Sequence, residues 1–507
     1  MKLERTKNSL RSLISGVINK IILLIMPFIV RTIFIKTLGI EYLGLNSLFI
    51  SLLNILNLAE LGVGSAIVFN LYGAIANNDK EEICSLMNFY KKIYRYIGLF
   101  VITIGVGLLP FLKYFCDIEK VPGDINIYLI YILHLINSAL SYFLYSYKNC
   151  LLIGFQQLHI SNNVNTIVKI VLNILQGLFL VLGKSYYIYV ILIILATMME
   201  NILNAIIVTK KFPEYKSNGN ISKNKKEEIY NKVKALFLYK IGGVVLTSVD
   251  SIIISAFLGL TILGKYNNYY YVISTLFGFF QVYYNAMLAG VGNSIASESI
   301  EKNKKDFEKL NFIQGWLVGW CSICLVCLYQ HFIRIWIGED NLFAELVPIF
   351  LAIYFYVWKM MDIVNLYKEA AGLWEYDKYR PIIAAIINLI INIILVRIIH
   401  IYGIIISTIL AIIGIILPWS VVILYKVYFK EKSIEFWKNY IINIFVTVVA
   451  GVITYVFCSI LNRTDLLGLI IKCVVCVLIP NVIYFVLYYK NNNFIVTKKW
   501  VIDKIKR

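Results

Sequence analysis

Apolar runs of about 20 residues follow one another along almost the whole chain of 507 residues. Each run is long enough to cross a hydrocarbon core of roughly 30 Å as a helix. Hydrophobic residues make up 60% of the chain, well above the share found in soluble domains. Because a bilayer offers no partners to exposed backbone groups, spans of this kind must be helices or closed barrels. The length of the runs predicts an all-α polytopic membrane protein.

Fourteen spans fit the apolar pattern, and the tightest hairpins are expected after Leu182 and after His400. The expected limits of the spans are 12–36, 43–70, 93–112, 126–147, 161–182, 187–208, 236–258, 266–290, 311–331, 344–366, 382–400, 402–424, 440–461 and 467–489. The first run is too long for a cleavable signal peptide, and no small-residue cleavage site follows it.

Lysine and arginine gather in alternate loops, such as Thr209–Lys234, Glu301–Lys309 and the basic C-terminal tail. Cytoplasmic loops of membrane proteins carry such an excess, so both termini are expected in the cytoplasm. The external loops are all short. The net charge of +19 has the same explanation, and no nucleic-acid partner is expected.

The pattern LGxxxLG occurs twice, at Leu38–Gly44 and at Leu258–Gly264. Each copy falls in the first external loop of one half of the chain. Each is followed by a span that ends in a glycine pair, within Leu61–Ile67 and Ala289–Ile295, and then by a charged cytoplasmic loop. The second span is about eight residues longer in the second half. The matching order predicts two six-span repeats, related by a pseudo-two-fold axis along the membrane normal.

The glycines of the motif are expected to form tight external turns, and the glycine pairs are expected to let helices approach closely or flex. The predicted organisation has four parts. These are an N-terminal six-helix bundle (1–208), a cytoplasmic linker (209–235), a C-terminal six-helix bundle (236–424), and two additional helices with a basic tail (425–507).

The stretches Arg31–Ile83, Arg334–Asp340 and Tyr367–Leu395 resemble bacterial polysaccharide repeat-unit flippases of the Wzx type. These belong to the multidrug/oligosaccharidyl-lipid/polysaccharide (MOP) exporter superfamily. The resemblance implies two six-helix bundles and two additional helices in a bacterial cytoplasmic membrane. It also implies alternating access that moves an undecaprenyl-diphosphate-linked oligosaccharide to the outer leaflet, for capsule, exopolysaccharide or O-antigen, without covalent chemistry.

Ionisable residues inside spans are costly, so they are the first candidates for such work. Lys20 and Arg31 lie close to one face of the first span and could pass a diphosphate along; the alternative is that both snorkel to the membrane surfaces. Lys169, Asn173 and Gln176 form a polar face of the fifth span. For that face, substrate contact and hydrogen bonding between helices both stay open.

Asp250 lies in the seventh span at nearly the place that Arg31 holds in the first repeat. An ion pair at an external gate, a site for H⁺ or Na⁺, and a structural pair are the three interpretations. Glu60 and Asp362 are further candidates for gating or ion coupling. Asp362 is also three residues from Lys359, which could neutralise it.

Gln281 and Asn285 share one face of the eighth span and are candidates for sugar contact. The neighbouring Tyr269–Tyr271 fits an interfacial aromatic belt better. Cys321, Cys324 and Cys327 also share a helix face, and with one nearby histidine, His331, they are expected to be packing residues rather than metal ligands. No metal and no cofactor are expected, while coupling to an H⁺ or Na⁺ gradient stays open.

The expected partners are the lipid-linked oligosaccharide, membrane lipids, and a polymerase and glycosyltransferases of the same pathway, with the chain itself a monomer. Three other functions are alternatives: a peptidoglycan-precursor (lipid II) flippase, a MATE-type drug/cation antiporter, and a membrane glycosyltransferase or polymerase. The last is disfavoured because the short external loops leave little room for a catalytic site.

Overall fold

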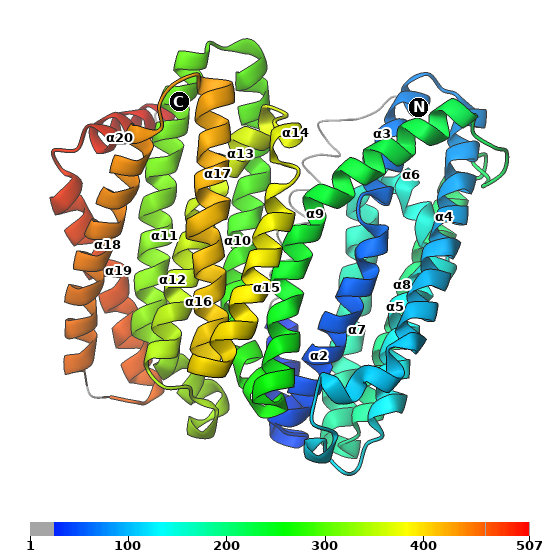
Figure 1. Ribbon diagram of the computed structural model, residues 1–507, viewed down its shortest axis with the longest axis horizontal. Coiled ribbons are helices and arrows are strands. Elements are labelled where there is room, and N and C mark those ends of the chain that lie inside the picture. Colours follow the sequence, from blue (N-terminus) through cyan, green and yellow to red (C-terminus); the bar gives the residue numbers. More distant parts are fainter. Residues whose placement is uncertain (1–24, 462, 506–507) are drawn as a thin grey trace. The chain divides into compact units, whose positions relative to one another are not determined.

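The computed structural model describes residues 25–461 and 463–505, and every regular element within these ranges is helical (Figure 1). The chain forms two compact units, residues 1–264 and residues 265–507. The expected seventh span and the second LGxxxLG motif belong to the first unit, and the expected eighth span belongs to the second. Lys20 lies outside the described residues.

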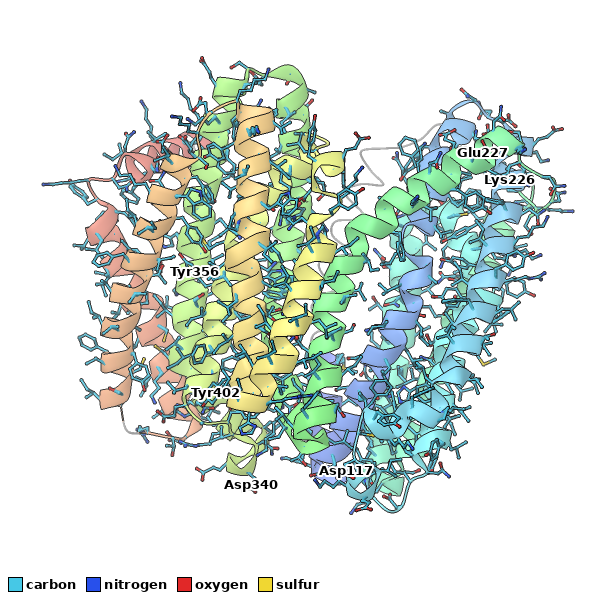
Figure 2. All side chains as sticks on the ribbon, in the orientation of Figure 1. Asp117, Lys226, Glu227, Asp340, Tyr356 and Tyr402 are labelled. Carbon is cyan, nitrogen blue, oxygen red and sulfur yellow. The ribbon has the colours of Figure 1, made fainter. Side chains whose placement is uncertain are left out.

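The first unit begins with a helix over residues 25–37. The elements that follow are α2 (Ile40–Leu56), η1 (Asn57–Glu60), α3 (Val63–Ala76), α4 (Lys80–Gly107), η2 (Leu109–Tyr114), η3 (Ile118–Lys120), α5 (Ile127–Phe143), η4 (Ser146–Lys148), α6 (Asn149–Gly154), α7 (Leu158–Gly183), α8 (Tyr186–Lys211) and α9 (Lys223–Leu258). Asp117 lies at the opposite end of this unit from Lys226 and Glu227 (Figure 2).

The second unit holds most of α10 and all later elements. These are α10 (Leu260–Ser297), α11 (Ile300–Ile337), η5 (Glu339–Asn341), α12 (Leu346–Met360), α13 (Asp362–Ala370), α14 (Trp374–Asp377), α15 (Arg380–Ile399), α16 (Ile401–Ala411), η6 (Ile412–Ile416), α17 (Leu417–Ile423), η7 (Leu424–Phe429), α18 (Ile434–Ile460), α19 (Leu466–Tyr488) and α20 (Asn492–Ile505). The α18/α19 pair packs on α11, and α20 lies crosswise to it (Figure 1).

Eleven helical stretches of the described chain are long and apolar enough to cross a bilayer, or twelve if α5 and the bent segment after it form one span. The chain is therefore a multi-pass membrane protein. Of the remaining expected spans, the first is described only from residue 25. The third runs along α4, which carries Lys91, Lys92 and Arg95 within its length. The number fourteen stays a prediction.

Both tight hairpins are confirmed. Lys184 (φ 43°) separates α7 from α8, and His400 (φ 50°) separates α15 from α16. Side-chain caps fix other helix starts, because the first backbone N–H groups of a helix lack partners within it. Asp465, for example, accepts a hydrogen bond of 3.0 Å from the N–H of Gly468 at the start of α19. This bond lowers the pKa of the Asp465 carboxyl below its usual value.

The turns of the two LGxxxLG motifs have the same backbone conformation. Gly39 has φ 112° and ψ 173°, and Gly259 has φ 92° and ψ 171°. Positive φ of this size is a region that glycine occupies at little cost. Near these turns, the Thr261 hydroxyl donates a hydrogen bond of 3.1 Å to Glu41. The predicted turn role is confirmed for Gly39 and Gly259, whereas Gly44 and Gly264 lie within the helices α2 and α10.

The two motifs also contact each other within the first unit. A Cβ atom placed on Gly44 would lie 2.1 Å from the backbone oxygen of Leu260, and one on Gly264 would lie 2.3 Å from that of Ile40. Ile40 and Leu260 hold the same position in their motifs, as do the two glycines. The contact is therefore reciprocal, like an interface between two symmetric copies. Only residues without a side chain allow the two backbones to come this close.

The second span of the first repeat is interrupted. It consists of α2, the single 3₁₀ turn η1, and α3, with Gly62 (φ 90°, ψ −22°) directly before α3. In the second repeat, the glycine at the same point of the motif is Gly290. It lies inside α10, which is one unbroken helix. One glycine pair thus follows a break in the helix, while the other does not.

Candidate functional site

Glu60 lies at the end of η1 and is the centre of a cluster of tyrosine hydroxyls. The hydroxyl of Tyr94 donates to one carboxylate oxygen of Glu60, and the hydroxyl of Tyr142 donates to the other at 2.9 Å. Tyr90 donates in turn to Tyr94 at 2.6 Å. A carboxyl group at membrane depth is costly unless it is hydrogen-bonded, and α4 and α5 supply the necessary donors.

Asn57 extends this cluster by one helical turn. Its side-chain oxygen accepts a hydrogen bond of 3.0 Å from Ser138, and the Tyr142 hydroxyl lies 3.1 Å from the same oxygen. Residues three apart eclipse each other on a 3₁₀ turn, so Asn57 and Glu60 present their side chains on one side. The 3₁₀ geometry of η1 thus brings an amide and a carboxyl group to the same hydroxyl.

A cavity of about 490 Å³ opens beside Glu60 within the first unit. Its lining consists of the interrupted second span and part of α9: Asn54, Asn57, Leu58, Glu60, Leu61, Gly62, Gly64, Ser65, Val244 and Ser248. The wall offers one carboxyl group together with amide and hydroxyl groups. A polar cavity lined in part by an interrupted span is the kind of place where transporters bind ions or polar cargo.

The polar face of the fifth span lies on α7. Asn173 and Gln176 are buried and donate to backbone carbonyls, Asn173 to Lys169 of its own helix at 2.6 Å and Gln176 to Tyr189 of α8 at 3.3 Å. The second bond joins two helices, which was one of the two interpretations of this face. Lys169 and Arg31 are half-buried. Substrate contact by these four residues stays a prediction.

Asp250 is buried on α9 in the first unit. The serines at 248, 251 and 255 on the same helix are buried as well. A buried carboxyl group requires hydrogen bonds or a charged partner. All three interpretations of Asp250 remain consistent with this position.

Two candidate sites of the second unit differ in their surroundings. Gln281 and Asn285 are exposed on α10, and Gln281 donates to Asn285 at 2.9 Å. Exposed amides within a span are unfavourable against lipid and favour contact with water or polar cargo. Asp362, by contrast, forms an ion pair of 3.0 Å with Lys359, whose ammonium group lies 4.6 Å from the ring centre of Phe277. The predicted pairing of Asp362 with Lys359 is confirmed.

Sequence reasoning missed a second group of charges. Asp377 is fully buried and bonds Lys368 at 2.5 Å and the guanidinium group of Arg380 at 2.6 and 2.8 Å. Lys368 also donates to Ser420 at 3.0 Å. Asp377 and Arg380 are three residues apart, a spacing that could have indicated part of this group. The partner Lys368 could not be assigned without the fold.

A buried amide network was missed as well. Asn388 and Asn392, one turn apart on α15, bond each other at 3.2 Å. Ser407 donates to Asn392 at 2.5 Å, and Asn388 donates to Thr408 at 3.1 Å. Two asparagines at i, i+4 spacing inside an apolar run were the available signal.

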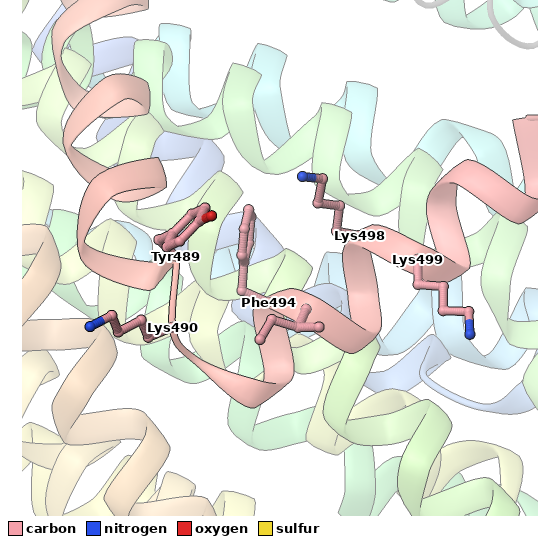
Figure 3. Close-up of a pocket in the computed structure, with 6 residues that line it drawn as sticks. Tyr489, Lys490, Phe494, Lys498 and Lys499 are labelled. Carbon is pink, nitrogen blue, oxygen red and sulfur yellow. The ribbon is translucent and has the colours of Figure 1, made fainter.

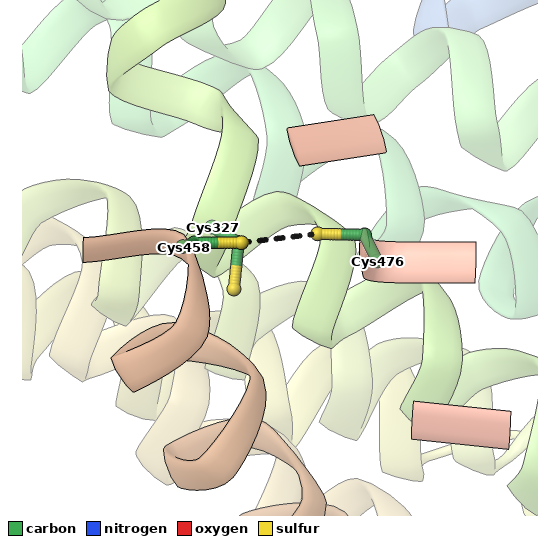
Figure 4. Close-up of side chains that lie close together, drawn as sticks. All are labelled: Cys327, Cys458 and Cys476. Atoms are coloured by element: carbon green, nitrogen blue, oxygen red, sulfur yellow. Dashed lines mark hydrogen bonds between the residues drawn. The ribbon is translucent and has the colours of Figure 1, made fainter. Parts of the chain in front are cut away.

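Cys327 does not pack alone. Its sulfur, from α11, lies near those of Cys458 on α18 and Cys476 on α19, all within 4.8 Å of one another (Figure 4). The sulfurs of Cys458 and Cys476 are 3.8 Å apart. Thiolates at such spacing are ligands for soft metal ions. The cluster also joins the α18/α19 pair to α11, a contact between residues more than 100 positions apart.

Solved structures of several transporters share the fold of this chain. A MATE family multidrug resistance transporter of the MOP superfamily, in an inward-facing conformation, is 14% identical with a TM-score of 0.61, over 78% of this chain and 93% of that one. The lipid II flippase MurJ is 15% identical with a TM-score of 0.64, over 94% and 98%. A MOP superfamily transporter from Pyrococcus furiosus is 15% identical with a TM-score of 0.53, over 84% and 97%.

The fold is thus that of MOP superfamily transporters, as the sequence resemblance implied. Residues 6–290 match the model of the polysaccharide biosynthesis protein family, and this chain belongs to that family. No curated protein matches the sequence. The MurJ structure covers more of this chain than the MATE structure does, 94% rather than 78%.

Proposed function

We propose that this protein is a flippase of the Wzx type. It moves an undecaprenyl-diphosphate-linked oligosaccharide repeat unit from the inner to the outer leaflet of a bacterial cytoplasmic membrane, for synthesis of a surface polysaccharide. The match to the polysaccharide biosynthesis protein family carries this proposal, and the MOP transporter fold supports it. The reaction is transport by alternating access and requires no covalent chemistry.

Polar groups of the two units, each unit taken by itself, supply what such a transporter needs. The cargo carries a diphosphate and many hydroxyl groups, which the hydrocarbon core does not solvate. We assign contact with the diphosphate to Arg31 and Lys169, and to Lys20 of the first span. We assign hydrogen bonds with the sugar hydroxyl groups of the cargo to four amide side chains: Asn173, Gln176, Gln281 and Asn285.

Glu60 is the group that we assign to ion coupling. Its carboxyl group is held by hydroxyl donors from two other helices and lies in the wall of a cavity of about 490 Å³. Binding of H⁺ or Na⁺ there would change the charge in a break of the second span, where the backbone can respond more easily than within a continuous helix. Asp250 is the second candidate for this role.

In the proposed function, the protein is oriented in the membrane with both termini in the cytoplasm. Lys226 then lies on the cytoplasmic side and Asp117 on the external side, in agreement with their positions at opposite ends of the first unit (Figure 2). Single cysteines introduced at these two positions of an otherwise cysteine-free variant test the orientation. A membrane-impermeant thiol reagent added to whole cells should label position 117 and spare position 226; the reverse pattern would contradict it.

Complementation tests the function. The gene is expressed in strains that lack their own repeat-unit flippase, with surface polysaccharide and lipid-linked repeat units in the inner leaflet as readouts. Restored polysaccharide is the expected result with at least one repeat unit. A strain depleted of its lipid II flippase is the parallel arm. If growth were rescued in that arm alone, the substrate would be the peptidoglycan precursor, and the proposed substrate would be wrong.

Lys169→Ala tests the cationic path within the same assay. Removal of the charge should lower transport of a diphosphate-linked cargo by about tenfold, the equivalent of about 1.4 kcal/mol, at normal membrane insertion. Lys184→Ala, at the exposed hairpin between α7 and α8, is the matched control and should change little. Equal activity of the two variants would remove Lys169 from the path.

A further inference from the structure

A further helix follows the last apolar span and folds back against the bundle. After α19, the segment Tyr489–Asn491 turns the chain into α20. The N–H of Asn491 donates to the carbonyl oxygen of Tyr488 at 2.8 Å, and the Asn491 side chain accepts from the N–H of Asn493 at 2.9 Å. These bonds fix the corner between α19 and α20.

Phe494 attaches α20 to the rest of the second unit. Its ring stacks on Trp316 of α11, with ring centres 6.0 Å apart, and meets the edge of Phe485 of α19 at 5.7 Å. Thr497, three residues further on, is buried on the same face. Residues that are three apart lie on the same side of a helix. One face of α20 therefore packs on α11 and α19.

The other face of α20 is left exposed and is both apolar and basic. Ile495 is 52% exposed and Val496 is 45% exposed, next to Lys498 and Lys499. This alternation of exposed aliphatic and basic residues is typical of helices that lie in a membrane interface. The helix therefore has a protein face and a lipid face.

A cavity of about 640 Å³ lies at the corner between α19 and α20. Its lining consists of three aromatic or aliphatic residues, Tyr489, Phe494 and Ile495, and of three lysines, Lys490, Lys498 and Lys499. In Figure 3, Lys490 and Lys499 stand at its two ends, with Tyr489, Phe494 and Lys498 between them. The cavity thus combines apolar groups with three cations in its lining.

The charge at this corner is of one sign. The sequence from Tyr489 to Trp500 holds three lysines and no acidic residue, and Asp503 follows near the end of α20. Among the described side chains, no carboxylate lies within ion-pair distance of these lysines. The inner leaflet of a bacterial membrane is anionic, and each lysine close to such a surface contributes about 1 kcal/mol of attraction.

From this geometry we propose that the α19–α20 corner is a binding site for the phosphate head group of an anionic phospholipid of the inner leaflet. The three lysines of the cavity lining attract the phosphate, and the acyl chains lie along the exposed aliphatic face of α20. The site is separate from the transport path proposed above, and it requires only that the C-terminal end of the chain lies at the inner leaflet.

Lipid retention by the purified full-length protein tests this proposal. Native mass spectrometry counts bound phosphatidylglycerol and phosphatidylcholine for the wild type and for the variant K490Q/K498Q/K499Q. We expect the variant to bind phosphatidylglycerol at least about fivefold more weakly, which corresponds to about 1 kcal/mol. Binding of phosphatidylcholine should not change, and the difference should shrink at high salt. A thermal unfolding curve confirms that the variant is folded.

K210Q/K211Q/K223Q is the matched control, because it removes three exposed lysines outside this cavity. If the control variant lost phosphatidylglycerol to the same extent, general surface charge would explain the weaker lipid binding, and the proposal would be overturned. Glycerol phosphate without acyl chains is the second arm, and it should not displace the lipid from the apolar groups of the cavity. Preferential displacement by undecaprenyl phosphate would also overturn the proposal, because the site would then hold the carrier lipid.

Discussion

The second spans of the two repeats begin in the same way and then differ. Both start after a glycine with positive φ, and both reach a glycine pair followed by a charged loop. Between these points, the first repeat has the break of η1 with Glu60 two residues before Gly62. In the second repeat, α10 continues, and Leu288 stands two residues before Gly290. The two repeats thus share the turn and the close helix contact. Only the first repeat has a break in the helix with a carboxyl group beside it.

The shared glycines therefore do not by themselves break a helix. Gly290 and Gly292 stay helical, and a Cβ added to either would meet no atom within 4 Å. In the first repeat, α4 and α5 contribute Tyr94 and Tyr142, which hold Glu60 in place. We attribute the break to these tertiary bonds together with the glycine. We propose that the break beside Glu60 serves transport, whereas the shared turn serves the architecture.

Glu60→Leu is the substitution with the largest expected effect, because it gives the first repeat the residue type of the second. The hydroxyls of Tyr94 and Tyr142 lose their acceptor, at a cost of about 1–3 kcal/mol each. Transport should fall at least tenfold in the complementation assay. Leu288→Ala, at the matching position, should stay within about twofold of wild type. Glu60→Gln keeps an acceptor without a charge, and full activity of that variant would exclude ion coupling at Glu60.

Gly44→Ala and Gly264→Ala test the contact between the two motifs. Each adds a methyl group where a backbone oxygen lies within 2.1 or 2.3 Å, so the two helices must separate. Overpacking of this kind typically costs about 1–3 kcal/mol. Because the contact is reciprocal, both variants should lower the unfolding temperature in detergent by similar amounts. Unequal effects would argue against a symmetric contact.

Gly62→Ala and Gly290→Ala compare the two glycine pairs directly. At Gly62 the new methyl group meets Leu236 at 2.7 Å, and the backbone has positive φ. At Gly290 the space is open and the backbone is helical, where alanine is preferred to glycine by about 1 kcal/mol. The first substitution should destabilise the protein and the second should not, as measured by thermal unfolding. If the Gly290→Ala variant were less stable than the wild type, the space around this position of α10 would be more restricted than the structure shows.

Gly39→Ala and Gly259→Ala have the smallest expected effect. Both residues have positive φ, and a side chain there costs about 1–3 kcal/mol at most. Near Gly39 a Cβ would meet only the Glu41 carboxylate at 3.2 Å, and near Gly259 it would meet nothing within 4 Å. Both variants should therefore lower the unfolding temperature by similar amounts, and by no more than Gly44→Ala and Gly264→Ala do, because backbone strain is the main cost. A large effect in one copy only would show that the turns are not equivalent.

Much of the architecture followed from local pattern. The spans were predictable because a bilayer fixes the length of an apolar helix, and the hairpins at Lys184 and His400 followed from the gaps between the runs. The ion pair of Asp362 with Lys359 was predictable because the two residues are three apart in the sequence, although Met361 separates α12 from α13 between them. The bonds of Asp377 to Lys368, and of Cys458 to Cys476, join different helices, and no local spacing indicated them.

The amino-acid sequence alone is enough to establish a helical membrane protein with a repeated glycine motif, because hydrophobic length and residue order are properties of the chain. The contact between the two motifs is a result of folding, since 220 residues separate them and the fold brings their backbones together. The position of Glu60 in a break beside a cavity is a result of folding as well. The hydroxyls that hold this carboxyl group come from α4 and α5, which the sequence pattern could not place against it.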